Sequence, residues 1–109
     1  MDILIQADGV TLTEAIKDVI DEKISHVEQY APRAVRARVR LRKVSAHPSP
    51  RQYVVRILVE IPGADLSAEE SGANVVGALD VVAGKIERRL RKRKTDRLAR
   101  RERDARRKP

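Results

Sequence analysis

The side chains with binding chemistry in this 109-residue sequence are basic, and they fall into two regularly spaced groups. The first group alternates with small or branched apolar residues in VRARVRLR, residues 35–42, and consists of Arg36, Arg38, Arg40 and Arg42. Side chains two positions apart on a strand lie about 6.5–7 Å apart, close to the phosphate repeat of a nucleic-acid backbone. The stretch therefore predicts a strand with one apolar and one cationic face.

The second group follows a KxxRRxxKR pattern near the carboxyl end and consists of Lys85, Arg88, Arg89, Lys92 and Arg93, with Lys94 next to it. The helix macrodipole favours cations at a carboxyl end, but that effect accounts for one or two of them. Only Tyr30 and Tyr53 are aromatic, which disfavours stacking on single-stranded bases. We therefore expect both groups to bind phosphates of folded RNA or a duplex.

Neither enzymatic nor cofactor chemistry is indicated. His26 lies in a predicted helix and His47 in a predicted turn, and the chain has no cysteine and no carboxylates at metal-ligand spacing. The five glycines form neither a GxGxxG motif nor a P-loop. We expect no catalytic residue, no metal site, no cofactor and no small-molecule substrate.

The charge is strongly segregated along the chain. Residues 1–28 carry seven acids and two lysines, residues 29–59 carry eight bases and no acid, and residues 91–109 carry eleven bases and three acids. No segment approaches the ~18 apolar residues of a membrane span, and the amino end lacks the features of a signal peptide. With no cysteine, the sequence predicts a cytoplasmic protein that neither crosses nor binds a membrane.

Apolar periodicity and turn signals predict six elements in the order β-α-β-β-β-α. They are a strand over 2–7, a helix from Thr11 or Thr13 to about 30, strands over 35–44 and 53–61, a weak strand over 64–70, and a helix from Ser71 through Leu90. HPSPR, residues 47–51, is a predicted turn. The weak strand has Glu70 in an inward position, where an apolar residue is expected.

These elements predict an α+β fold: a four-stranded mixed sheet with two helices packed on one face, like a double-stranded-RNA-binding domain. The other face is left open, and the arginines of residues 35–42 make it cationic, with Arg56 beside them. Gly77 and Gly84 lie on one face of the second helix, where they could let the first helix or the sheet approach closely; the alternative is a somewhat frayed helix. We expect one domain over residues 1–94 and a basic tail over 95–109, either a helical extension or disordered.

Two stretches resemble the bacterial ribosome hibernation promoting factor family, which includes the ribosome-associated inhibitor also called protein Y. They are GVTLTEAIKDVIDEKISHVEQY, residues 9–30, and ADLSAEESGANVVGALDVVAGKIERRLRKRK, residues 64–94. The most specific matches are the helix opening at Thr13–Ile16, the Glu28-Gln29-Tyr30 helix end, and Ala78-Leu79-Asp80 followed by the basic cluster at Lys92–Lys94. The resemblance covers residues 1 to about 97 and is to the short form of the family.

The resemblance implies the same fold and a function without catalysis. Such a protein would bind the 16S rRNA of the small ribosomal subunit in the channel between head and body, where mRNA and tRNA lie, and keep idle ribosomes inactive and intact. It also implies that Lys85, Arg88, Lys92, Arg93 and Lys94 face ribosomal RNA. Away from the ribosome, we expect a monomer.

Two other functions fit the same residues. The chain could be a general structured-RNA-binding module, in which case it would bind bare duplex RNA as tightly as ribosomes. It could also be a protein-interaction module that modulates a transcription factor, with the arginine face meeting an acidic partner.

Overall fold

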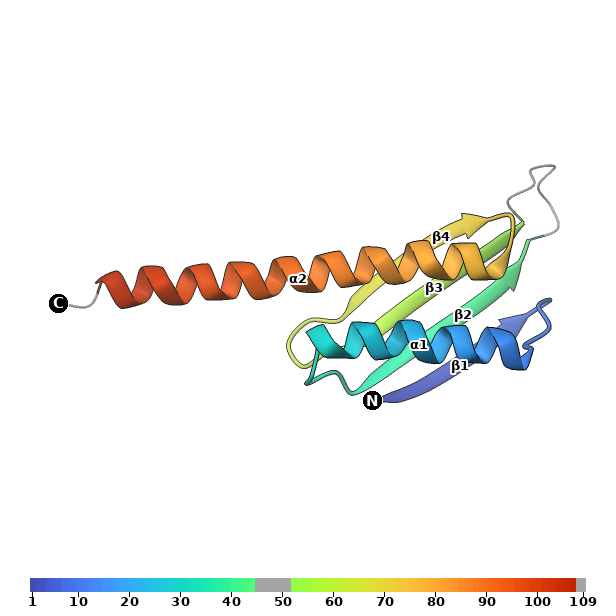
Figure 1. The fold of residues 1–109 in the computed structure, drawn as a ribbon, viewed down its shortest axis with the longest axis horizontal. Helices are drawn as coiled ribbons and strands as arrows, with labels where there is room; N and C mark the ends of the chain where they lie inside the picture. The colour runs from blue at the N-terminus through green and yellow to red at the C-terminus, as the bar shows by residue number, and fades with distance from the viewer. Residues whose placement is uncertain (45–51, 108–109) are drawn as a thin grey trace.

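The computed structural model describes residues 1–44 and 52–107, with side chains up to Glu102, so the predicted turn at 47–51 and His47 lie outside the described residues. The elements are β1 Asp2–Asp8, α1 Glu14–Tyr30, β2 Arg36–Lys43, β3 Tyr53–Glu60, β4 Leu66–Gly72 and α2 Val75–Arg107 (Figure 1). This order is the one that the sequence predicted.

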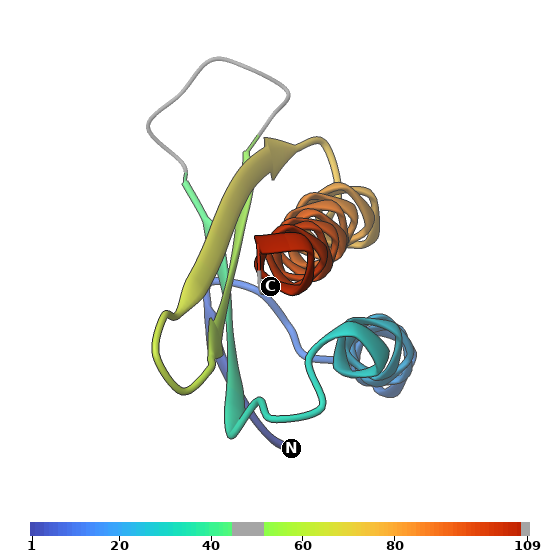
Figure 2. The same cartoon turned by 90° about the vertical axis from the view of Figure 1, so that its left-hand side faces the viewer.

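The four strands form one mixed sheet in the order β1-β2-β3-β4. β1 and β2 are parallel because α1 connects them as a crossover. β2 pairs with β3, and β3 with β4, in antiparallel fashion, because the stretches of chain between these strands are too short for a crossover. Both helices lie on the same side of the sheet, and the other side is left open (Figure 2). The predicted fold class is confirmed.

Local signals fix where α1 begins and ends. Thr13 is the N-cap, and its hydroxyl oxygen accepts a hydrogen bond from the backbone N–H of Ile16 at 3.2 Å. Of the two candidate caps, the chain therefore uses Thr13 and not Thr11. The helix ends at Tyr30, just before Ala31 and Pro32, because a residue that precedes proline disfavours the helical conformation.

The start of α2 differs from the prediction. β4 continues to Gly72, so α2 begins at Val75, and the side-chain oxygen of Asn74 accepts a hydrogen bond from the N–H of Gly77 at 2.7 Å. A Cβ atom at Gly77 would meet Asn74, and one at Gly84 would meet nothing within 4 Å. Of the two alternatives for these glycines, a close approach of α1 or the sheet is therefore not found.

The core lies between the sheet and the two helices. Its largest fully buried side chains come from α1, β2, β3 and α2, and they are Ile20, Ile24, Val27, Val39, Leu41, Val55, Ile57, Val59, Leu79, Val82 and Ile86. The last buried residue of α2 among the described side chains is Leu90, yet the helix continues to Arg107, 17 residues further. This part of α2, the extension, projects past α1 and the sheet (Figure 1) and gives the molecule a longest dimension of 62 Å.

Across the described residues, neither helix has a run long and apolar enough to cross a membrane.

Candidate nucleic-acid interface

The four strand arginines lie where the alternation predicted. The apolar residues of β2 are buried under the helices, and Arg36, Arg38, Arg40 and Arg42 point to the open face of the sheet. Arg56 of β3 is the direct cross-strand neighbour of Arg40, so a fifth arginine joins this face. The sheet register thus gathers these side chains on one surface.

This surface is not purely cationic, because neighbouring strands supply carboxylates that pair with each β2 arginine. Arg38 lies 3.0 Å from Glu60, and Arg36 lies 3.9 Å from the same carboxylate. The other pairs are Arg40 with Asp8 at 3.4 Å and Arg42 with Glu69 at 3.1 Å. With Asp2 opposite Arg36, the described part of the open face has four carboxylates against five arginines. The expected cationic face is wrong in this respect.

Replacing all four β2 arginines with glutamine should therefore lower stability. Each pair is partly exposed and contributes up to about 1 kcal/mol, and the variant also leaves unpaired carboxylates close together on one face. We expect a loss of about 1–3 kcal/mol in the free energy of unfolding, measured with urea.

The control adds Asp8→Asn, Glu60→Gln and Glu69→Gln to the same variant, which removes the partner charges. We expect it to recover part of the lost stability. An unchanged free energy of unfolding in the four-arginine variant would show that these ion pairs contribute nothing.

Three of the predicted basic residues on α2 hold the helix against β4 and the turn before it. Lys85 forms an ion pair with Glu70, which explains how β4 tolerates a glutamate at an inward position. Arg89 donates to the backbone carbonyl of Ser67. Arg93 donates to the backbone carbonyls of Ala64 at 2.9 Å and Asp65 at 3.5 Å. These cations are already engaged within the protein.

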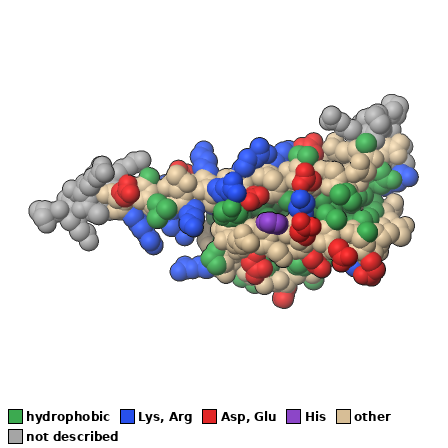
Figure 3. All heavy atoms as spheres, in the orientation of Figure 1, with side chains coloured by type: hydrophobic (Ala, Val, Ile, Leu, Met, Phe, Trp, Pro, Cys, Tyr) green, Lys and Arg blue, Asp and Glu red, His purple; other side chains and the backbone are tan. Residues whose placement is uncertain are grey.

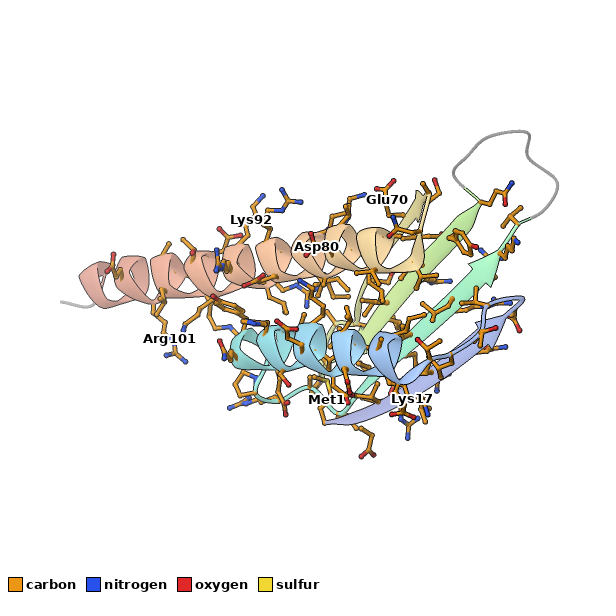
Figure 4. All side chains as sticks on the ribbon, turned by 45° about the vertical axis from the view of Figure 1, so that its right-hand side comes forward. Met1, Lys17, Glu70, Asp80, Lys92 and Arg101 are labelled. Atoms are coloured by element: carbon orange, nitrogen blue, oxygen red, sulfur yellow. The ribbon has the colours of Figure 1, made fainter. Side chains whose placement is uncertain are left out.

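The other three predicted α2 residues point to solvent. The side chains of Arg88, Lys92 and Lys94 are exposed, and Figure 4 shows Lys92 pointing outward on the side of α2 away from α1. Arg88 donates only to the backbone carbonyl of Gly84, one turn earlier, at 3.3 Å. Within the described part of the chain, no ion pair neutralises any of the three. We call Arg88 and Lys92, which are one turn apart, the outer face of α2.

Two side-chain contacts join α1 and α2 across the groove between them. Lys23 lies 2.7 Å from Asp80, and this hydrogen bond raises the pKa of Lys23 above its ordinary value. The guanidinium of Arg91 lies 4.9 Å from the ring centre of Tyr30 and donates to its hydroxyl at 2.7 Å, which raises the pKa of Arg91. Both side chains are therefore charged at neutral pH, and their contacts join the helices at two points.

His26 also lines this groove, which has a volume of about 390 Å³. Its side chain is exposed, and the described residues contain no cluster of three or more groups that could hold a metal ion. Nothing in the groove resembles a catalytic constellation.

The ten predicted site residues therefore do not form one surface. Both helices lie on one side of the sheet (Figure 2), and the β2 arginines belong to the opposite face of the sheet, whereas the outer face of α2 consists of exposed side chains on one of these helices. On that helical side, basic side chains follow α2 and acidic ones surround α1 (Figure 3). A single flat partner can contact only one of these two surfaces.

Beyond Arg93, the described side chains include three exposed arginines that were missing from the predicted site: Arg97, Arg100 and Arg101. The sequence carried a signal for two of them. Arg97 follows Ile86, and Arg101 follows Leu90, by eleven residues, which is about three helical turns. The apolar stripe of α2 thus becomes cationic where the sheet ends.

Comparison with known proteins gives a consistent picture. The model of the family described as sigma 54 modulation protein / S30EA ribosomal protein matches residues 3–98. A ribosome hibernation promotion factor of Deinococcus radiodurans is 32% identical over 87 residues, which are 80% of this chain and 46% of that protein. One of Staphylococcus aureus is 33% identical over 103 residues, 92% of this chain and 51% of that protein. The chain thus spans about half the length of these curated relatives.

Solved structures support the fold. The N-terminal domain of protein Y from Thermus thermophilus matches with a TM-score of 0.71 at 22% identity, over 84% of this chain and 98% of that one. A ribosomal subunit interface protein from Coxiella burnetii matches with a TM-score of 0.74 at 18% identity, over 87% of this chain and 99% of that one. At these identities the likeness concerns the fold alone.

Proposed function

We propose that this chain, which belongs to the sigma 54 modulation protein / S30EA ribosomal protein family, is a ribosome hibernation factor that binds the small ribosomal subunit. The two curated relatives are ribosome hibernation promotion factors, and they match 80% and 92% of this chain. The partner is the 16S rRNA, and the protein acts in the cytoplasm without catalysis.

The observation that carries this proposal is the row of solvent-facing cations on α2. Arg88 and Lys92 are exposed and have no acidic partner among the described residues, so binding a phosphate breaks no ion pair. The β2 arginines, in contrast, must give up Asp8, Glu60 or Glu69 before they bind RNA. We therefore assign the first contact with rRNA to α2 and a supporting role to the open face.

The contacts within the protein prepare α2 for this role. Lys85, Arg89 and Arg93 fix one side of the helix to β4 and its turn, and Arg91 fixes the other side to α1. A helix that is held in place loses little conformational freedom on binding, which favours affinity. We propose that the domain enters the channel between head and body as a rigid body and excludes mRNA and tRNA from the decoding centre.

Cosedimentation of the purified chain with small ribosomal subunits tests this function. We expect binding at low salt that weakens as salt rises, with log K falling by ~0.9 per phosphate contact on duplex and less on single strands. Added mRNA and initiator tRNA should compete with the chain for the subunit. Absence of binding at low salt, or binding that mRNA and tRNA leave unchanged, would overturn the proposal.

The same assay separates the two alternatives. A general RNA-binding module would bind a bare RNA duplex as tightly as the subunit. A module that modulates a transcription factor would retain its partner from cell extract after nuclease treatment.

A further inference from the structure

The extension of α2 presents cations on the side of the helix that packs on the sheet in the domain. Taking 100° per residue, Arg97 and Arg101 lie within about 20° of the direction of Leu90, which is buried against the sheet with 3% exposure. Lys94 lies about 40° from the same direction. We call Lys94, Arg97 and Arg101 the inner face of the extension. Figure 4 shows Arg101 and Lys92 pointing to opposite sides of α2.

The sheet no longer covers this inner face. Arg93 marks the limit of the domain, because it donates to Ala64 and Asp65 in the turn between β3 and β4. Beyond it, Lys94, Arg97 and Arg101 are exposed and have no hydrogen bond or ion pair with any described residue. The two acids of this stretch, Asp96 and Glu102, lie about 120° away from the direction of Leu90, on either side.

The inner face and the end of the domain form a corner. The extension leaves the domain beside the end of α1, where Arg91 contacts Tyr30 (Figure 1). The connection from α1 to β2 lies at the same end and carries the exposed Arg33. The helix side of the corner is therefore lined by cations, and Arg33 adds a further one from the domain.

We infer that this corner is a second phosphate-binding surface, which takes a nucleic-acid backbone on the side of α2 opposite to its outer face. That the bound nucleic acid is RNA follows from the proposed function, on which this inference rests. The guanidinium fork suits phosphate oxygens, and Arg97 and Arg101 are spaced by about 6 Å of helix rise. A protein partner fits less well, because protein interfaces centre on apolar or aromatic anchors, and the described inner face has none. The nearest, Leu98, is turned about 80° away from Leu90.

An exchange of charges within the extension tests this surface at constant composition. The variant combines Asp96→Arg with Arg97→Asp, and Arg101→Glu with Glu102→Arg, in the full-length chain. Net charge stays the same, but both guanidinium groups leave the inner face and two carboxylates replace them. Because the exchanged side chains lie outside the core, the thermal midpoint should not change.

Affinity is measured for purified small ribosomal subunits and for a mixed-sequence RNA duplex, each over a salt series. For the exchange variant we expect binding to both at least about tenfold weaker than that of the original chain. The salt slope on the duplex should fall by about 1.8, the value for two lost phosphate contacts.

The outcomes distinguish this inference from the proposed function. If the original chain binds and the exchange variant keeps its affinity and salt slope, the inner face is not a phosphate surface, although the ribosome function stands. If the variant loses affinity for subunits but not for the RNA duplex, the surface binds an acidic protein segment, and the inference is overturned. If the original chain binds no subunits, the proposed function fails, and duplex binding alone then decides the inference.

Discussion

A chain carrying Arg88→Glu and Lys92→Glu should lose its binding to small ribosomal subunits while it keeps its fold. Both side chains are exposed on the outer face of α2, and their only described contact is the weak hydrogen bond from Arg88 to a carbonyl of its own helix. Two phosphate contacts are worth about 1.8 log units at 0.1 M salt, and the new carboxylates also repel the phosphates. We therefore expect affinity to fall by roughly 100-fold at that salt concentration.

A matched control reverses two exposed lysines elsewhere, Lys17→Glu in α1 and Lys43→Glu at the end of β2. The net charge changes by the same amount, so any effect of overall charge is common to both variants. We expect the control to retain affinity within about fivefold, because distant exposed charges are screened beyond about 10 Å at 0.1 M salt. Equal losses in both variants would show that net charge, and not the outer face of α2, drives binding.

The fold could be predicted from the sequence because its signals are local and periodic. Alternation along β2 placed its apolar residues inward and its arginines outward, and the Thr13–Ile16 opening located the start of α1. The boundary between β4 and α2 was harder, since the stretch from Ser71 to Asn74 contains no strong capping signal beyond Asn74 itself. Tertiary pairing with β3 extends β4 to Gly72 and delays the helix.

The candidate site was less predictable, because a sequence pattern shows where charges lie along an element but not which charges meet across elements. Asp8, Glu60 and Glu69 come from three different strands, and only the register brings them to the β2 arginines. Glu70 occupies an inward position of β4, where the sequence alone predicts an apolar residue. Its ion pair with Lys85, fifteen residues later, explains why an acid is tolerated there and where the Lys85 ammonium group points. Acidic residues on the predicted outward face of the strands, and Glu70 at an inward position, were the signals in the sequence for these two sets of ion pairs.

The second large effect is expected in the core, where Ile86→Ala should destabilise the domain by about 2–5 kcal/mol. Ile86 is fully buried in the stripe that α2 packs on the sheet, and it lies next to Lys85, which forms an ion pair with β4. The shorter side chain leaves a cavity at the point where the helix is anchored. Urea unfolding measures the loss as a lower midpoint with an unchanged slope.

Two further substitutions show whether burial is the cause. Ile86→Val removes one methyl group and should cost only about 0.5–1.5 kcal/mol. Leu98→Ala removes a larger group from the extension, where the side chain is 51% exposed, and should change stability by less than about 0.5 kcal/mol. If the extension lies outside the core, the loss in the free energy of unfolding is largest for Ile86→Ala, smaller for Ile86→Val and smallest for Leu98→Ala. A loss at Leu98 as large as that at Ile86 would instead mean that the extension packs on the domain, and the cationic corner would then be closed to RNA.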